Sequence, residues 1–483
     1  MDRRTFVGST FSLAAATTLG ATSLFAAEAG DRQRSILKVK GLRIVEGDRP
    51  VRLRGFNLGG WMDIEDYMIG LPWTEWKIRE QFRKVLGEDA YQAFFGAYMD
   101  SHVAEADIAF LAEQGFTFVR LPFNYRHFES DFAPGQWLES GFRRLDDIIA
   151  ICRKHNIWVL LDLHAAAGAQ ARDQNAGSAY GEAYFWYYRT FMDRSVALWR
   201  EIARRYRAEP TVAGYNVLCE PVTDDLKKLN DVYAASIRAI REVDKDHMIV
   251  LDPNLWARDI SSLEDRLFED PQVVPALHHY YSETYAFERL TRYPDKIDGK
   301  AYDRAALAAT MDGKHDQRRI QRPVIAAEFG FSRPNTQPFS VQLAITKDLV
   351  SIFEEKEWPW AMWCYKDVEH MGIVRPRMDT PWKVFLNSEP ISGFLQKYAD
   401  MEAPFTDAVR RFLSNTDIDL DTRENWADEV RRDFDPLALD YILRRLAGKS
   451  QSELMSMGQS FAFKNCQVDQ DRLGILKPFL TQA

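Results

Sequence analysis

Cysteine is scarce in this chain, which carries only Cys152, Cys219, Cys364 and Cys466 among its 483 residues. Their spacing matches no zinc-binding pattern, and four cysteines are too few to form a disulfide scaffold in a chain of this length. The sequence therefore predicts no zinc site, and we assign no disulfide.

Clustered positive charge and long apolar runs are also missing. The formal net charge is −9, and lysine and arginine form no basic stripe that could neutralise phosphates, so a nucleic-acid partner is not expected. Beyond the N-terminus, no stretch approaches the roughly 20 apolar residues that a membrane helix needs. We therefore expect no stable membrane span in the mature chain.

The N-terminus has the pattern of a targeting segment. Arg3 and Arg4 precede an uncharged stretch over Val7–Ala27, and Ala27-Glu28-Ala29 has the small-x-small form of a cleavage site. The paired arginines resemble the bacterial twin-arginine signal, so we predict an export signal over residues 1–29 and a periplasmic or secreted protein. A single membrane anchor is the alternative, but alanine, threonine, serine and glycine make the stretch weakly apolar.

Aromatic side chains are abundant: they make up 13% of the chain, with 13 Trp and 19 Tyr. Sugar faces pack on aromatic rings, so this composition fits a carbohydrate partner, although aromatic-rich packing of the core explains it equally well. The length accommodates one large barrel domain and an appendage.

Short apolar runs alternate with longer helical patterns along most of the chain. A hairpin over residues 36–45 comes first, and eight strand candidates and six helix candidates follow. The strand candidates are Val51–Asn57, Phe116–Pro122, Ile157–His164, Val212–Glu220, Met248–Asp252, Val273–Tyr280, Val324–Glu328 and Trp360–Tyr365. The helix candidates are Val103–Gln114, Phe142–His155, Tyr184–Tyr206, Leu226–Val243, Ala301–Gln317 and Val341–Glu355. This alternation predicts a (β/α)₈ barrel over residues 36–400.

Two regions depart from the alternation. Residues 62–100, rich in Trp, Tyr and Phe, are predicted as an insertion after the first barrel strand and as a wall of the cleft. Residues 401–483 are predicted as a helical extension, with helices over Phe405–Ser414, Asp428–Ala447 and Gln451–Ser456 and no further strand. We expect this extension to pack on the barrel; a separate interaction module is the alternative.

Two glutamates stand where barrel enzymes place their reactive groups, at the C-terminal ends of strands. Glu220 and Glu328 are the only glutamates that end proposed barrel strands, since Glu46 belongs to the hairpin ahead of the barrel. Glycoside hydrolysis needs two carboxyl groups, one to protonate the leaving oxygen and, in a retaining enzyme, one to attack the anomeric carbon. We therefore predict that Glu220 and Glu328 are a catalytic pair, with capping or ion-paired structural glutamates as the alternative.

As a set, these strand ends resemble glycoside hydrolase family 5, whose members are retaining (β/α)₈ glycosidases. Arg54–Trp61 (RGFNLGGW) and Leu163–Gln170 (LHAAAGAQ) look most like the exo-β-1,3-glucanase-like branch, and the resemblance covers roughly residues 36–400. It implies hydrolysis of a carbohydrate substrate, a β-glucan or β-glucoside, without a metal or cofactor. β-Mannan or a glycolipid is the alternative substrate, and a non-catalytic carbohydrate-binding barrel is the alternative function.

The resemblance also implies a role for each site residue. Glu220 would be the acid/base and Glu328 the nucleophile. Arg120 would keep the nucleophile ionised by charge pairing, and Tyr280 would donate a hydrogen bond to it. Trp363 would form the platform under the sugar in the −1 subsite. A buried ion pair for Arg120 and ordinary core packing for Trp363 are the structural alternatives.

The histidines carry one ambiguity. By the resemblance, His164 and His278 would contact the sugar or orient the carboxylates, while a satisfied core position is the alternative for His164. The family's His-x-Tyr spacing fits His278 with Tyr280, but His279 with Tyr281 has the same spacing. Adjacent strand residues point to opposite faces, so only one of these pairs can face the site.

One residue departs from the family pattern. The family has asparagine immediately before its acid/base, where it donates a hydrogen bond to the sugar 2-hydroxyl, and this chain has Cys219. A thiol is a weak donor, and the 2-hydroxyl contact strengthens in the transition state. We therefore predict that Cys219 changes how the −1 sugar is held or slows the enzyme on ordinary glucans.

Overall fold

The computed structural model describes residues 34–280, 290–297, 299–312, 320–330, 337–369, 371–414, 416 and 434–481. The predicted export signal over residues 1–29 lies outside this part of the chain and stays a prediction. Tyr281, which belongs to the alternative His-x-Tyr pair, also lies outside the described residues. Among the described helices, none has an apolar run long enough to cross a membrane.

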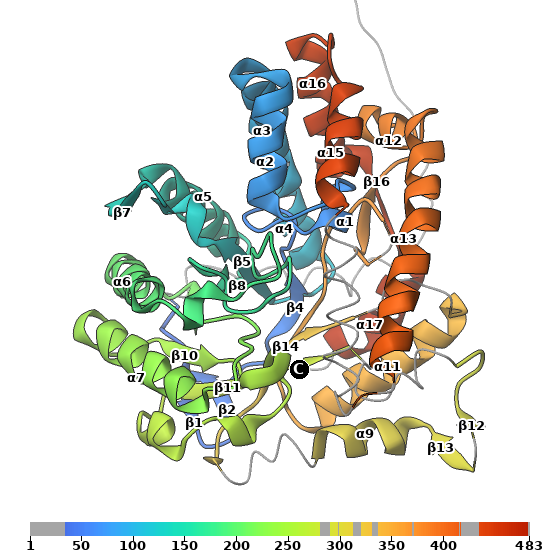
Figure 1. Cartoon of the computed structure of the whole chain (residues 1–483). Helices are drawn as coiled ribbons and strands as arrows, with labels where there is room; N and C mark the ends of the chain where they lie inside the picture. Colours follow the sequence, from blue (N-terminus) through green and yellow to red (C-terminus); the bar gives the residue numbers. More distant parts are fainter. Residues whose placement is uncertain are drawn as a thin grey trace, which may run out of the picture. The chain divides into compact units, whose positions relative to one another are not determined.

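Eight parallel strands close into a barrel (Figure 1). They are β4 (Arg54–Asn57), β5 (Phe118–Asn124), β8 (Trp158–Ala165), β9 (Val212–Asn216), β10 (Met248–Leu251), β11 (Val273–His279), β14 (Ile325–Phe329) and β15 (Trp360–Met362). The strands pair in chain order, and β15 closes the barrel on β4 through the register pair Ala361 and Gly55. The predicted (β/α)₈ barrel is confirmed.

The helices that cover the barrel are amphipathic, as predicted. They are α4 (Glu105–Glu113), α5 (Glu139–Lys154), α6 (Arg189–Tyr206), α7 (Leu226–Val243), α9 (Arg304–Asp312) and α11 (Phe339–Glu355). In α7, the Asp225 side chain accepts a hydrogen bond from the Lys228 backbone N–H at 2.9 Å and caps the N-terminus. Leu229, Tyr233 and Ile240 then recur at helical spacing and are buried.

Alternation along the strands separates an apolar layer from a polar one. On β8, Leu160 belongs to an interior cluster that also contains Leu37 and Ile44 from the N-terminal hairpin. The hairpin therefore packs against the end of the barrel interior that lies opposite the C-terminal strand ends. Asp162 and His164 follow at spacing two and therefore share the inward face of β8. The charged layer thus lies toward the C-terminal ends of the strands.

The remaining elements decorate this barrel. The hairpin is β1 (Lys38–Lys40) with β2 (Arg43–Glu46), and β3 (Arg49–Pro50) extends it to three strands. The insertion after β4 contains α1 (Asp66–Ile69), α2 (Glu75–Leu86) and α3 (Glu88–His102). Short elements elsewhere are β6 (Glu129–Ser130), β7 (Ala133–Trp137), η2 (Tyr184–Trp186), α8 (Asn254–Ala257), β12 (Asp295–Ile297), β13 (Lys300–Tyr302), β16 (Val374–Pro376) and α12 (Pro381–Leu386).

The C-terminal region differs from the prediction. Its elements are α13 (Ile391–Leu413), α15 (Asp435–Arg444), α16 (Gln451–Gly458), β17 (Cys466–Val468) and α17 (Gln470–Leu480). Helix α13 begins before residue 401, helix α17 was not expected, and a further strand is present. The expectation of no further strand was wrong, because β17 pairs antiparallel with β16; three residues are too few to show a strand period in the sequence. Helices α15 and α16 lie beside α2 and α3 of the insertion (Figure 1).

Candidate active site

The C-terminal strand ends bring all the predicted site residues together. Arg120 lies on β5, His164 on β8, His278 on β11 and Glu328 on β14. Tyr280 and Trp363 directly follow β11 and β15, and Cys219 and Glu220 lie in the segment after β9. All are buried except Tyr280, which is partly exposed. Strand β9 ends at Asn216 rather than at Glu220 as predicted, since Glu220 takes a left-handed backbone angle, φ +46°, that an extended strand cannot contain.

Glu328 is held through both of its carboxylate oxygens. Arg120 Nη1 donates to Oε1 at 2.5 Å, and the Tyr280 hydroxyl donates to Oε2 at 2.8 Å. His278 Nδ1 lies 3.6 Å from Oε2. His278 and Tyr280, one of the two pairs with the predicted His-x-Tyr spacing, therefore contact the glutamates.

Glu220 has a different environment. Its Oε1 lies 2.8 Å from His278 Nδ1, and its Oε2 accepts a hydrogen bond from Asn175 Nδ2 at 2.9 Å. Its backbone N–H donates to Asp252 Oδ2 at 2.9 Å, which fixes the strained turn that carries it. Burial raises the pKa of the Glu220 carboxyl. This environment favours a protonated carboxylic acid beside an ion-paired one.

Arg120 is the centre of the buried network below the two glutamates. Its Nη2 lies 3.0 Å from Asp162 Oδ1 and 3.3 Å from Cys219 Sγ, and its Nε donates to Asn216 Oδ1 at 2.9 Å. Burial raises the pKa of Asp162 to about 7 even though the Arg120 cation opposes that rise. Because its guanidinium meets several acceptors at once, its position is fixed by the barrel as a whole.

His164 and Trp363 form a stacked pair at the edge of the site. Their ring centroids are 5.2 Å apart with an interplanar angle of 10°. His164 Nδ1 lies 2.9 Å from Asp162 Oδ2, and burial lowers the pKa of His164 to about 4, so the ring is neutral near pH 7. The Trp363 indole N–H donates to the Tyr67 hydroxyl at 2.6 Å, which sets the plane of the indole.

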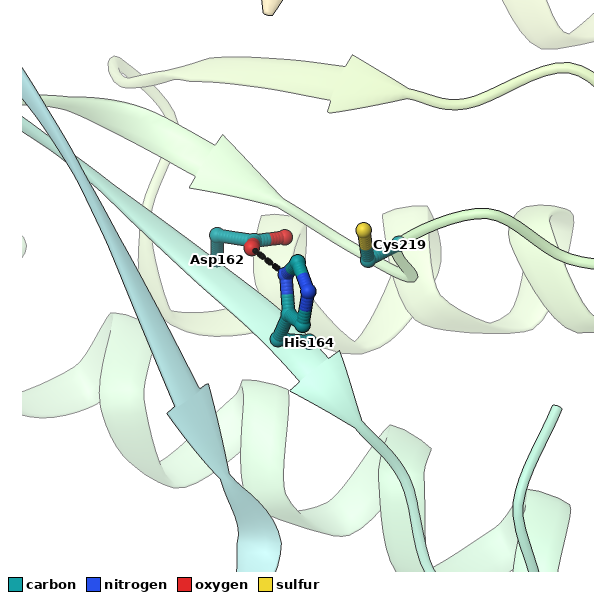
Figure 2. A group of neighbouring side chains, drawn as sticks. All are labelled: Asp162, His164 and Cys219. Carbon is teal, nitrogen blue, oxygen red and sulfur yellow. Dashed lines mark hydrogen bonds and ion pairs between the residues drawn. The ribbon is translucent and has the colours of Figure 1, made fainter. Parts of the chain in front are cut away.

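Figure 2 shows Asp162, His164 and Cys219 converging from β8 and the segment after β9. Their ligand atoms lie within 4.8 Å of one another, and these residue types could hold a metal ion. However, the Arg120 guanidinium already contacts both Asp162 and Cys219. A second cation would face that guanidinium, so the cluster fits an arginine-centred network better than a metal centre.

Several residues of the network were not predicted as site residues. Asp162, Asn216 and Asp252 lie in or next to predicted strands, and the alternation of Asp162 with His164 on one strand was the available signal. Asn175 lies in the β8 loop, which we define as residues 166–183, and nothing in its local sequence marks it. Its role depends on the path of that loop back to Glu220.

Three tryptophans near strand ends or in loops, Trp61, Trp186 and Trp256, differ in how far they are exposed. Trp61 and Trp186 are buried, and their indole N–H groups donate to the carbonyls of Met99 and Gln170. Trp256 is partly exposed and donates to Asp173 Oδ2 at 2.8 Å. Trp256 is therefore the one of the three that keeps a surface for a sugar.

The insertion lies against two cavities. One of about 640 Å³ is bounded by α2, α3 and the segment after β5, and another of about 360 Å³ by Trp76, that segment and the β8 loop. Neither cavity is lined by Glu220 or Glu328. The expectation that the insertion forms a wall of the catalytic cleft therefore stays a prediction.

A closed parallel barrel with two buried glutamates at its strand ends defines the class of the protein: a barrel enzyme with the groups that glycoside hydrolysis requires. A family model for cellulases, glycosyl hydrolase family 5, matches residues 82–369. The chain therefore belongs to glycoside hydrolase family 5. The family predicted from the strand-end motifs is confirmed, and the chain is a glycosidase rather than a binding-only barrel.

Named relatives cover different shares of the chain. A β-xylosidase from Phanerodontia chrysosporium is 32% identical over 457 residues, which is 89% of this chain and 95% of that enzyme. Endoglucanase C from Acetivibrio thermocellus is 27% identical over 259 residues, which is 51% of this chain and 66% of that enzyme. Glucan 1,3-β-glucosidase I/II from Saccharomyces cerevisiae is 27% identical over 277 residues, or 50% of this chain and 58% of that protein.

Proposed function

We propose that this protein hydrolyses β-glucan or β-glucosides with retention of anomeric configuration, by double displacement. The observation that carries the proposal is the separation of its two glutamates: an oxygen of Glu220 and an oxygen of Glu328 lie within 4.8 Å of each other. Carboxyl groups about 5–5.5 Å apart are typical of retaining glycosidases, whereas about 6.5–9.5 Å leaves room for the water of an inverting enzyme.

The unequal surroundings of the two carboxyl groups support different roles for them in this proposal. Glu220, whose pKa is raised by burial, donates its proton to the leaving oxygen as the glycosidic bond breaks. Glu328 attacks the anomeric carbon and forms a glycosyl ester. Glu220, now a carboxylate, then takes a proton from water as the water oxygen attacks the anomeric carbon and displaces Glu328.

Neighbouring residues support each step. The Arg120 cation and the Tyr280 hydroxyl stabilise Glu328 as a carboxylate, both when it waits to attack and when it leaves. His164 Nε2 is buried and has no hydrogen-bond partner among the residues that the structure describes, so a sugar hydroxyl that reached it would satisfy it. Trp363, stacked on His164, offers the platform under the −1 sugar.

The substrate is inferred from the relatives. The resemblance to the glucan 1,3-β-glucosidases favours a β-glucan or a β-glucoside. A β-xyloside is the second candidate, because the relative that matches 89% of this chain is a β-xylosidase. β-Mannan and glycolipids would need the same machinery, and β-mannan is tested beside the two leading candidates.

A panel of phenyl β-glycosides (glucoside, xyloside, mannoside) together with β-1,3-glucan, β-1,4-glucan and β-mannan tests this proposal. The wild type is expected to turn over the glucoside fastest, and Glu220→Ala is expected to lower kcat for the phenyl glycoside by about 10²–10⁴-fold, because phenol leaves poorly without a proton donor. Turnover by Glu220→Ala at the wild-type rate would contradict the assignment, and faster xyloside hydrolysis would select the second candidate.

The pH profile is the control for the role of Glu220. A proton donor must be protonated in the free enzyme, so kcat/KM is expected to fall as pH rises through the pKa of Glu220. Burial raises that pKa, so this alkaline limb should lie above the range of an ordinary glutamate. The limb should disappear in Glu220→Gln, and its persistence there would assign it to another group.

Cys219→Asn tests the departure from the family pattern. Cys219 Sγ lies 3.7 Å from Glu328 Oε1, so an amide placed there lies beside the nucleophile, and by the family resemblance it would donate to the sugar 2-hydroxyl. We expect kcat/KM for a β-glucoside to rise by about tenfold, which corresponds to one hydrogen bond in the transition state. The 2-deoxyglucoside, which lacks the hydroxyl, should not respond. If kcat/KM rose equally for both substrates, or for neither, the idea that Cys219 weakens the contact to the 2-hydroxyl would be rejected.

A further inference from the structure

The C-terminal region reaches the catalytic site through the β8 loop. Asp435, the first residue of α15, is fully buried, and its Oδ2 accepts a hydrogen bond from Gln174 Nε2 at 2.6 Å. Gln174 directly precedes Asn175, whose side-chain amide donates to Glu220 Oε2. Two residues of one loop thus connect the C-terminal region to the proposed proton donor.

A buried carboxylate is costly unless hydrogen bonds satisfy it, so Asp435 holds its partners firmly. The Tyr398 hydroxyl from α13 donates to its other oxygen at 3.0 Å. The backbone of the loop is held from the opposite side, where Thr74 Oγ1 donates to the Gln174 carbonyl at 3.2 Å and Trp76 Nε1 to the Gly177 carbonyl at 3.0 Å. Gln174 is therefore fixed both by its main chain and by its side chain.

We propose that Asp435 is a positioning residue for the reaction: it fixes Gln174, and thereby keeps Asn175 where its amide donates to Glu220. Residues 401–483 would then contribute to catalysis by shaping the β8 loop. This inference rests on the proposed role of Glu220 as acid/base.

The Asn175 amide stabilises the charged form of Glu220, so losing that hydrogen bond raises the pKa of the glutamate. Other groups also face Glu220 from the surrounding elements. They are His278 from β11, Glu328 from β14, His164 from β8, Asp252 after β10, Asp173 in the β8 loop and Arg258 after α8. Of these groups, only Asp173 belongs to the same loop as Asn175, so a positioning variant is expected to act chiefly through the contact from Asn175.

The test uses Asp435→Ala, Gln174→Ala and the double variant of the full chain. Each is expected to lower kcat/KM for a phenyl β-glycoside about five- to tenfold, because a donor displaced by a fraction of an ångström protonates the leaving group poorly. The alkaline limb of the profile should move to higher pH. A 2,4-dinitrophenyl glycoside, whose leaving group needs no proton, should react within about twofold of the wild type. Because Asp435 acts through Gln174, the double variant should match Gln174→Ala.

Gln81→Ala is the matched control. Gln81 Nε2 donates to Asp440 Oδ1 at 3.0 Å, so this change removes a contact between α2 and the same helix α15 without touching the β8 loop. It should leave the alkaline limb in place. Asp435→Asn, which keeps the side-chain shape, is the second variant if Asp435→Ala fails to fold.

Two results would overturn the inference. One is an unmoved alkaline limb with equal losses on both substrates, which indicates a structural role only; the other is additive losses in the double variant. A failure of the proposed function has a different signature, because Glu220→Gln would then keep the alkaline limb and the dependence on the leaving group. If Glu220→Gln loses both the alkaline limb and the dependence on the leaving group, while Asp435→Ala changes neither, only the positioning role of Asp435 is rejected.

Discussion

Glu328→Ala is expected to lower kcat for an aryl β-glycoside on the order of 10⁴-fold or more, and sodium azide is expected to restore turnover with an α-glycosyl azide as product. Removing the nucleophile prevents formation of the glycosyl ester. Azide can enter the vacated space and attack the anomeric carbon from the same face, so a single displacement inverts the configuration.

The remaining side chains favour this rescue. Arg120 loses Glu328 but keeps Asp162 at 3.0 Å, so it stays in place with an Nη group directed at the vacated position. The Tyr280 hydroxyl, which donates to Glu328 in the wild type, is released to donate to the anion. A small anion thus enters a space already arranged for negative charge.

Glu220→Ala provides the contrasting control, measured by the same NMR analysis of the azide product. There the nucleophile remains, a glycosyl ester still forms from a substrate with a good leaving group, and azide displaces the ester. Two inversions give a β-glycosyl azide. An α-azide from Glu220→Ala and a β-azide from Glu328→Ala would reverse the two assignments.

The barrel was predictable from the sequence because its signal is local. Each strand is a short apolar run, each covering helix repeats its apolar residues at helical spacing, and barrel enzymes use the C-terminal strand ends. That rule alone selects Glu220 and Glu328. The family resemblance added Arg120 and Tyr280, which the structure places on Glu328.

The parts that could not be predicted depend on the path of the chain. Asn175 reaches Glu220 only because the β8 loop folds back over the barrel. Asp435 meets Gln174 across 261 positions of sequence, and no local pattern encodes that pairing. The strained turn at Glu220 was likewise hidden, since a left-handed angle at a glutamate has no sequence signature.

Lys366 illustrates the limit of the strand-end rule. It follows β15, where a polar residue suggests a catalytic role, yet it is completely buried outside the glutamate network. Its Nζ donates to Asp107 Oδ1 and the His102 carbonyl, each at 2.6 Å, and to the Phe461 carbonyl at 2.8 Å. One ammonium group therefore ties a strand end, the insertion and the C-terminal region together.

Lys366→Met is accordingly expected to lower the free energy of unfolding by about 3–5 kcal/mol, since it leaves the buried Asp107 carboxylate without its cation and two carbonyls without this donor. Denaturant titration checks the value. Asp107→Asn in the Lys366→Met background should recover part of the loss, because it removes the uncompensated charge while its amide oxygen can still accept from the Ala104 N–H. Lys227→Met, which breaks an exposed ion pair with Asp231, is the surface control and should leave the denaturant midpoint close to that of the wild type.

The location of the damage separates this mechanism from general loosening of the core. Hydrogen exchange in Lys366→Met should rise first where the lost acceptors lie, at the end of α3 around His102 and in the C-terminal segment around Phe461. The barrel strands should stay protected, because the core of β5 and β8 does not depend on Lys366. Uniform loss of protection across the barrel, or stability within about 1 kcal/mol of the wild type, would show that Lys366 does not join the C-terminal region to the catalytic domain.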